Sequence, residues 1–173
     1  MCQCTEKVRY DSPLYYKTEY QQLSGVSTSS IAQHDYVSNA VGEISCATAQ
    51  TAGFGEIVGL ELMETGTTVQ KKDLRVWFFD KTITTPVSNS ARSFTTDELA
   101  YIVGYIDIVA ANYQATDSGT ASAYAQVLLD KPIPFQTLTG SQTIYYAVEV
   151  WGSSAPTYAS GAVLKFRFLF KRG

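Results

Sequence analysis

Histidine is nearly absent from this chain. The 173 residues contain one histidine, His34, so any histidine-based acid–base mechanism or Ser-His-Asp triad would have to use it. No Gly-x-Ser-x-Gly nucleophile elbow occurs anywhere in the sequence. Asp35 is adjacent, and on a strand its side chain would point away from that of His34. We therefore expect His34 to be a surface or hydrogen-bonded structural residue.

Cysteine is also scarce, with Cys2, Cys4 and Cys46 the only three. An odd number at one end of a chain is not the pattern of a disulfide framework and fits a reducing, cytosolic place of synthesis. Structural zinc needs four nitrogen or sulfur ligands, and only Cys46 and His34 could complete the Cys2-Gln3-Cys4 pair. Their spacing matches no known paired arrangement, so we predict no metal site.

Charged residues make up only 17% of the chain, and the net charge is −3. Such a chain has no overall positive field to attract phosphate backbones or anionic lipid. The run Lys165-Phe166-Arg167-Phe168 resembles a nucleic-acid-binding strand, but no second basic strand accompanies it. Its charges are better explained as protection of a sheet edge. We predict no nucleic-acid partner.

Long hydrophobic runs are missing. The longest, from Ala100 to Ala111, covers about twelve residues and contains Asp107, whereas a membrane-spanning helix needs roughly twenty. The first eleven residues carry charges where a signal peptide would need an apolar stretch. We therefore predict no membrane partner and no export by that route.

Apolar and aromatic residues are abundant, at 45% and 13% of the chain, as expected of a folded protein. They occur in short alternating runs separated by Pro, Gly, Ser and Thr, which is typical of an antiparallel β-sandwich. The sequence therefore predicts an all-β fold with two sheets. The expected strands are 31–37, 43–48, 56–64, 74–79, 102–109, 123–129, 133–138, 143–151 and 163–171.

Local signals refine this picture. Thr95 and Glu98 match a capping box and predict one helical turn, which Gly104 should end. Gly66 and Gly140 lie in turns where positive φ is expected.

Two other strand segments have distinctive compositions. Pro132 and Pro134 place their segment at a sheet edge or a bend, because proline cannot donate to a ladder. In the last strand Phe166, Phe168 and Phe170 share one face, which we expect to be core.

Residues 1–25 differ in composition from the sandwich domain, which we place at 26–173. This N-terminal part lacks sustained periodicity and carries Tyr10, Tyr15, Tyr16 and Tyr20 among charged residues. Two interpretations remain open: a disordered end, or an extended arm that orders on a neighbouring subunit. On the second, the four tyrosines form an interface.

Two further patterns could suggest chemistry. The segment Gly53 to Gly59 looks like a dinucleotide-binding loop, but strand residues follow it where a helix is required, so we expect a hairpin entry and no cofactor. A glycosidase needs two facing carboxylates. Nothing in the sequence singles out a pair among Asp97, Glu98 and Asp107, so no catalytic residue is assigned and an enzyme is not predicted.

Several segments together resemble small structural proteins of tailed-bacteriophage virions. The resemblance covers roughly residues 36–170 and is carried by 74–80, Pro86, Asn89, 94–104, 132–135, 143–146 and 156–161. It implies a jelly-roll-like sandwich that acts as a capsid decoration or cement protein on the outside of the shell. The implied partners are the major capsid protein and further copies of the chain, with a trimer favoured. Residues 1–25 have no counterpart in this resemblance.

An alternative function is a receptor- or carbohydrate-binding module of a tail or head fibre. Trp77, Trp151 and Tyr158 would then form an exposed platform for sugars, although the position of both tryptophans within strand patterns favours the core. A hydrolase acting on cell-wall glycans is a third possibility.

Overall fold

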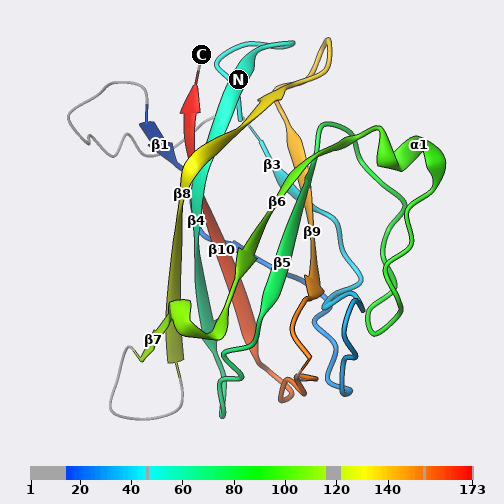
Figure 1. Cartoon of the computed structure of the whole chain (residues 1–173), viewed down its shortest axis with the longest axis vertical. Helices are drawn as coiled ribbons and strands as arrows, with labels where there is room; N and C mark the ends of the chain where they lie inside the picture. The colour runs from blue at the N-terminus through cyan, green and yellow to red at the C-terminus, as the bar shows by residue number, and fades with distance from the viewer. Residues whose placement is uncertain (1–14, 46, 116–121, 154, 173) are drawn as a thin grey trace.

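The computed structural model describes residues 15–45, 47–115, 122–153 and 155–172, which form two antiparallel sheets packed face to face (Figure 1). The six-stranded sheet has the order β1-β10-β4-β8-β7, with β2 also paired to β10. The four-stranded sheet has the order β3-β9-β5-β6. The predicted all-β sandwich is confirmed.

Regular structure is almost entirely strand. The elements are β1 (Tyr15–Lys17), β2 (Gln21–Gln22), β3 (Gly42–Ile44), β4 (Phe54–Thr65), β5 (Leu74–Phe79), α1 (Thr96–Leu99), β6 (Ile102–Ile108), the 3-10 turn η1 (Ala110–Asn112), β7 (Tyr113–Ala115), β8 (Ser122–Gln136), β9 (Ile144–Val150) and β10 (Val163–Arg172).

The strand pairing is that of a jelly roll. The first strands, β1 and β2, pair with the last, β10; β3 pairs with β9, β4 with β8, and β5 with β6. The chain therefore wraps as one long folded-over hairpin, which is the arrangement that produces two interlocking Greek keys. Short strands with regular turns could not reveal this order, because β10 with β1, β9 with β3 and β8 with β4 each join distant parts of the sequence, and only β5 and β6 are consecutive strands.

The core lies between the sheets and is rich in aromatic rings. Phe166, Phe168 and Phe170 of β10 are all buried on its inner face, as predicted. The ring centre of Phe168 lies 5.7 Å from that of Phe78 in β5 and 4.8 Å from that of Tyr146 in β9. Phe168 therefore joins the two sheets. Each fully buried ring of this kind contributes about 1.5 to 3 kcal/mol to stability.

Three strand predictions needed correction. Residues 31–37 do not form a strand: Asp35 and Tyr36 make only isolated bridges, and His34 has a φ of +68° that breaks the extended path. The strand expected at 43–48 spans only Gly42–Ile44. The two strands expected between 123 and 138 are one continuous strand, β8.

The helical turn and its capping box are confirmed, but its predicted end is wrong. Helix α1 ends at Leu99, and Gly104 lies within β6 opposite Phe78. A Cβ on Gly104 would lie 2.9 Å from Ile133 Cγ2, so this glycine allows close packing of β6 against β8. The turn glycine Gly140 has the predicted positive φ, of +82°, whereas Gly66 does not adopt one.

The two prolines of β8 lie where the strand has a partner on one side only. Pro134 pairs with Glu56 of β4, while β7 pairs with β8 only between Ala123 and Ala125. Within the described strands this part of β8 is therefore an edge, as predicted.

Candidate functional site on the outer face of the six-stranded sheet

The described part of the predicted N-terminal arm lies on the body of its own chain. Strand β1 pairs with β10, placing Tyr15 opposite Lys171 and Lys17 opposite Leu169. The amide of Thr18 continues this pairing by donating to the carbonyl of Phe168 at 3.0 Å. Tyr10 lies outside the described residues.

A buried carboxylate anchors this segment. Glu61, in the middle of β4, points to the outer face of the sheet but is only 1% exposed. Lys17 Nζ lies 2.7 Å from its Oε1, and Arg167 Nε donates to its Oε2 at 2.6 Å. Tyr20 donates its hydroxyl to the same carboxylate at 3.2 Å. Glu61 thus joins β1 and the turn after it to the sheet.

The negative charge of Glu61 is stabilised by the positive charges that contact it. Burial alone would raise the pKa of Glu61, but hydrogen bonds from Lys17 and Arg167, together with their positive charges, lower it below its usual value. Burial also raises the pKa of Tyr20, so its hydroxyl stays protonated and can donate to the carboxylate. The cluster is therefore an ionised glutamate held by two cations.

The three described arm tyrosines differ in their contacts. The ring of Tyr20 lies under the guanidinium of Arg167, at 4.4 Å, and that of Tyr16 under Arg172, at 4.1 Å. Tyr15 remains 39% exposed. Contacts of these tyrosines with a shell or a sister subunit remain a prediction.

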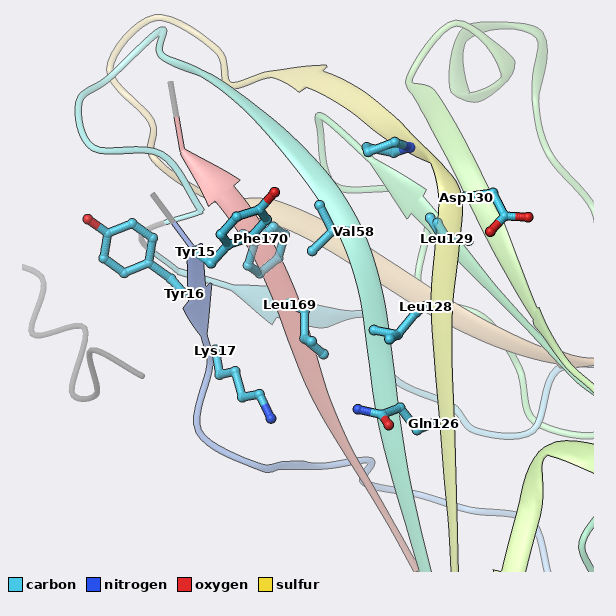
Figure 2. Close-up of a pocket in the computed structure, with 11 residues that line it drawn as sticks. Tyr15, Tyr16, Lys17, Val58, Gln126, Leu128, Leu129, Asp130, Leu169 and Phe170 are labelled. Atoms are coloured by element: carbon cyan, nitrogen blue, oxygen red, sulfur yellow. The ribbon is translucent and has the colours of Figure 1, made fainter. Parts of the chain in front are cut away.

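Beside this cluster lies an apolar groove of about 520 Å³. Figure 2 shows Tyr15, Tyr16 and Lys17 on one side of it, Leu128, Leu129 and Asp130 on the other, and Val58 and Leu169 between them.

The groove results from irregular strand pairing. In the register with β8, Ile57 pairs with Ile133 and Gly59 with Leu128, so that Val58 of β4 and residues 129–132 of β8 are all left out of the pairing. In the register with β10 only Val58 is skipped, because Phe170 pairs with Ile57 and Leu169 with Gly59. A bulge of this kind bends a strand and changes the direction of its side chains. Here it hollows the outer face of the sheet.

The groove has the composition of an interface. Leu128 lines the groove and is 63% exposed. Leu169 and Pro132 line it as well. The polar residues Lys17, Gln126 and Asp130 lie along the rim. An apolar centre with a polar rim is the usual anatomy of a protein–protein contact.

The outer face of the four-stranded sheet carries a different cluster. The guanidinium of Arg75 lies 3.3 Å from the ring centre of Trp151 and 3.8 Å from that of Tyr105. It also forms a bidentate pair with Asp107, at 2.6 and 2.8 Å. Asp107 therefore serves as the counter-ion of a buried arginine, which accounts for its position in an apolar strand.

His34 lies at the border of this second cluster. Its Nδ1 is 3.9 Å from Oε1 of the buried Glu149, and its ring contacts that of Trp151 at 5.1 Å. Burial raises the pKa of Glu149, although Arg92, 3.2 Å from its Oε2, opposes the shift. His34 itself is half-exposed and lies beside the carboxylate of Glu149, as a surface residue would.

The proposed sugar platform of three aromatic residues is not assembled. Tyr158 is buried in the core at 1% exposure, so its assignment to a surface platform was wrong. Trp77 is buried too, as its strand pattern favoured, and packs against Phe94 and Tyr105. Trp151 was expected in the core but is partly exposed just after the end of β9.

Other candidate residues are dispersed. Of the segment Gly53 to Gly59, only Gly53 precedes β4, and the other residues lie within that strand, which pairs with β8 and β10 and not with an adjacent strand as a hairpin would. Asp97 is exposed at the start of α1, while Glu98 turns inward to cap that helix. In the described ranges, no three His, Cys, Asp or Glu residues gather as metal ligands; Cys2, Cys4 and Cys46 lie outside these ranges. No helix among the described residues is long and apolar enough to cross a membrane.

Sequence reasoning missed Glu61 and the groove. A glutamate between Leu60 and Leu62 in an alternating strand signals an outward position, but not that two cations cover it. The bulge at Val58 has no local signal, because it is a property of the register with both neighbouring strands. Leu128 could have been noted as an apolar residue on the outward side of β8.

Comparison with known proteins gives little further information. No family model matches the chain, and no curated protein does. A solved structure of Desmodium yellow mottle tymovirus is similar at 14% sequence identity, covering 91% of this chain and 84% of that one, with a TM-score of 0.29.

Proposed function

We propose that this protein is a non-enzymatic structural protein of a phage virion, a decoration or cement protein that binds the outside of the capsid shell and stabilises it. Its partners would be the major capsid protein and two further copies of itself in a trimer. It would be made in the host cytoplasm and reside on the capsid surface.

The observation that carries this proposal is the uncovered apolar groove beside Glu61. A cement protein needs a stiff body with an adhesive surface and uses no bond-making chemistry. The floor of the groove belongs to β4 and β10, which lie in the interior of the sheet, and one wall is held by the ion pair from Lys17 to Glu61. A surface fixed in this way loses little conformational entropy on binding.

The jelly-roll topology supports the same proposal. Jelly rolls are a recurring architecture of viral capsid domains, although lectins and cupins share it, so the fold by itself does not determine a function. The resemblance of residues 36–170 to small virion proteins favours the capsid role among these.

The experiment that tests the proposal is the copy number of the protein in purified particles, measured by quantitative mass spectrometry against the major shell protein. A ratio comparable to that of the shell subunit is expected. A few copies per particle would indicate the tail or neck, and absence from the particles would exclude a virion role.

A second candidate function is favoured by the cluster around Arg75. Tyr105, 46% exposed, and Trp151 lie on either side of the arginine, and aromatic faces beside polar groups are common in carbohydrate-binding sites. A receptor- or carbohydrate-binding module would give a glycan-array signal that Trp151→Ala abolishes. Tyr158→Ala is not a suitable test, because Tyr158 is buried.

A further inference from the structure

The outer face of the six-stranded sheet carries an excess of positive charge. On β1, β4 and β10 the outward-pointing charged residues are four cations, Lys17, Lys165, Arg167 and Lys171, against two carboxylates, Glu56 and Glu61. Asp130 of β8, on the rim of the groove, is a third carboxylate, which leaves an excess of one positive charge among these residues. The chain as a whole has a net charge of −3, so even this small excess sets the face apart.

Not all of this charge is neutralised by neighbours. Glu61 is held by Lys17 and Arg167, and Glu56 pairs with Lys171 at 3.2 Å, where both side chains are more than a third exposed. Such an exposed pair is weak and exchanges partners readily. Lys165 forms no ion pair with any of the described residues. Positive charge is therefore available on both sides of the groove, along β10.

The apolar centre lies between these charges. Along the outward face of β10, Lys171 follows Leu169 directly, while Lys165 precedes it beyond Arg167, whose charge Glu61 neutralises. Leu169 pairs with Gly59, which pairs with Leu128. An apolar strip with cations at both ends is complementary to a segment whose apolar side chains are flanked by carboxylates.

We propose that the groove and its basic flanks bind an extended segment of the major capsid protein in which a short apolar stretch is flanked by carboxylates. The apolar side chains would cover Val58, Leu128 and Leu169, and the carboxylates would approach Lys165 and Lys171. That the segment belongs to the major capsid protein rests on the proposed function. The chemistry of the bound segment rests only on the residues of this face.

The first test uses peptides and does not depend on virus particles. A ten-residue peptide with leucines at its centre and two glutamates at each end is titrated into the isotope-labelled protein, and the same peptide with lysine in place of glutamate serves as the comparison. The glutamate peptide should shift the amide signals of Val58, Leu128 and Leu169 and bind at least about tenfold more tightly. Its affinity should fall when salt is raised from about 0.05 M to about 0.5 M.

Variants locate the contact. Leu128→Glu should weaken binding of the glutamate peptide by about tenfold or more, and Lys165→Glu with Lys171→Glu should do the same. Val87→Glu is the matched control, because Val87 is equally exposed, at 65% against 63% for Leu128, but lies in the segment between β5 and α1. It should leave binding unchanged. Dispersed amide spectra would show that each variant is folded.

Three results would overturn the inference: equal binding of both peptides, binding that Val87→Glu weakens as much as Leu128→Glu, or absence of signal shifts around the groove. A preference of the same face for single-stranded DNA or for anionic vesicles over the glutamate peptide would also overturn it.

The second test identifies the source. A photo-crosslinking residue at position 128 should capture an acidic, apolar segment of the shell protein in particles, while the same residue at position 87 should not. If the protein is present at the shell ratio but the groove binds no glutamate peptide, the inference fails and the proposed function stands. If the peptide binds but the protein is absent from particles, the proposed function and the capsid source fail while the binding chemistry stands.

Discussion

Lys17 and Glu61 form an ion pair of 2.7 Å between strand β1 and the middle of strand β4, and these strands are not neighbours in the sheet. The lysine side chain reaches over β10, which lies between them, to a carboxylate that is only 1% exposed. One buried charge thus ties the first described strand to the interior of the sheet and fixes one wall of the groove.

Removing this charge should release the first strands. In Glu61→Gln both Lys17 and Arg167 lose their carboxylate, and we expect the free energy of unfolding to fall by about 2 to 3 kcal/mol, because buried pairs are costly to break on one side. Hydrogen exchange at the amide of Thr18, which bonds to Phe168, should accelerate by at least about tenfold.

The control is Lys171→Met, which removes only the exposed pair with Glu56 and should change stability by less than about 1 kcal/mol. Equal exchange rates at Thr18 in the Glu61→Gln variant and the natural protein would show that the ion pair does not hold β1.

The fold could be predicted from the sequence further than the site could. Alternation of apolar residues is local, so the strands β5, β9 and β10 and the inner face of β10 were readable, as was the capping box of α1. The segment 31–37 was misread because Ile31 and Val37 are buried without being in a strand, and the intervening His34 adopts a positive φ. Burial without extended pairing leaves the same apolar pattern as a strand.

The site depends on relationships that no local pattern encodes. The groove exists because Val58 is skipped in two registers, and Glu61 is covered by residues from β1 and β10. The arm tyrosines were noticed from composition alone, which indicates adhesion but does not distinguish contact with the chain's own body from contact with another. Tyr20 meets its own Arg167.

Lowering the pH should reduce the free energy of unfolding, because it protonates the carboxylate of Glu98. This carboxylate accepts from the amides of Thr95 and Thr84, at 2.8 and 2.5 Å, and these bonds lower its pKa from 4.5 to about 2. A pKa lower in the folded than in the unfolded state gives stability that is present above about pH 4.5 and lost as the pH falls towards 2.

Glu98→Gln should therefore cost about 1 to 2 kcal/mol at pH 7, since two backbone amides lose a charged acceptor. The difference from the natural protein should shrink steadily between pH 4.5 and 2, as measured by urea unfolding at each pH. If the difference in the free energy of unfolding stays constant over this range, the stabilisation does not come from an ionised carboxylate that accepts hydrogen bonds from those amides.

Tyr158 should tolerate loss of its hydroxyl but not of its ring. Its side chain is buried in the core, and within the described part of the chain its Oη has no hydrogen-bond partner. An unsatisfied buried hydroxyl costs about 1 to 3 kcal/mol, so Tyr158→Phe should leave stability unchanged or raise it by about 1 kcal/mol. Tyr158→Ala should lower it by about 3 to 5 kcal/mol. Thermal unfolding of both variants measures this, and a clear loss in Tyr158→Phe would reveal a polar partner for the hydroxyl.

Gly59 should be required for the shape of the groove. It pairs with both Leu128 and Leu169 next to the bulge, and a Cβ there would lie 2.4 Å from the carbonyl oxygen of Val127. Because that contact is with backbone, Gly59→Ala must displace β8 from β4, and we expect a loss of about 2 kcal/mol or more. Gly66→Ala is the matched control: its φ is not positive and its Cβ would meet Ala162 at an ordinary 3.4 Å. Urea unfolding should show a large effect for the first and a change within about 0.5 kcal/mol for the second. Equal effects would mean that β8 can move away from Gly59 without cost, and the groove would then be a deformable surface that a partner must first order.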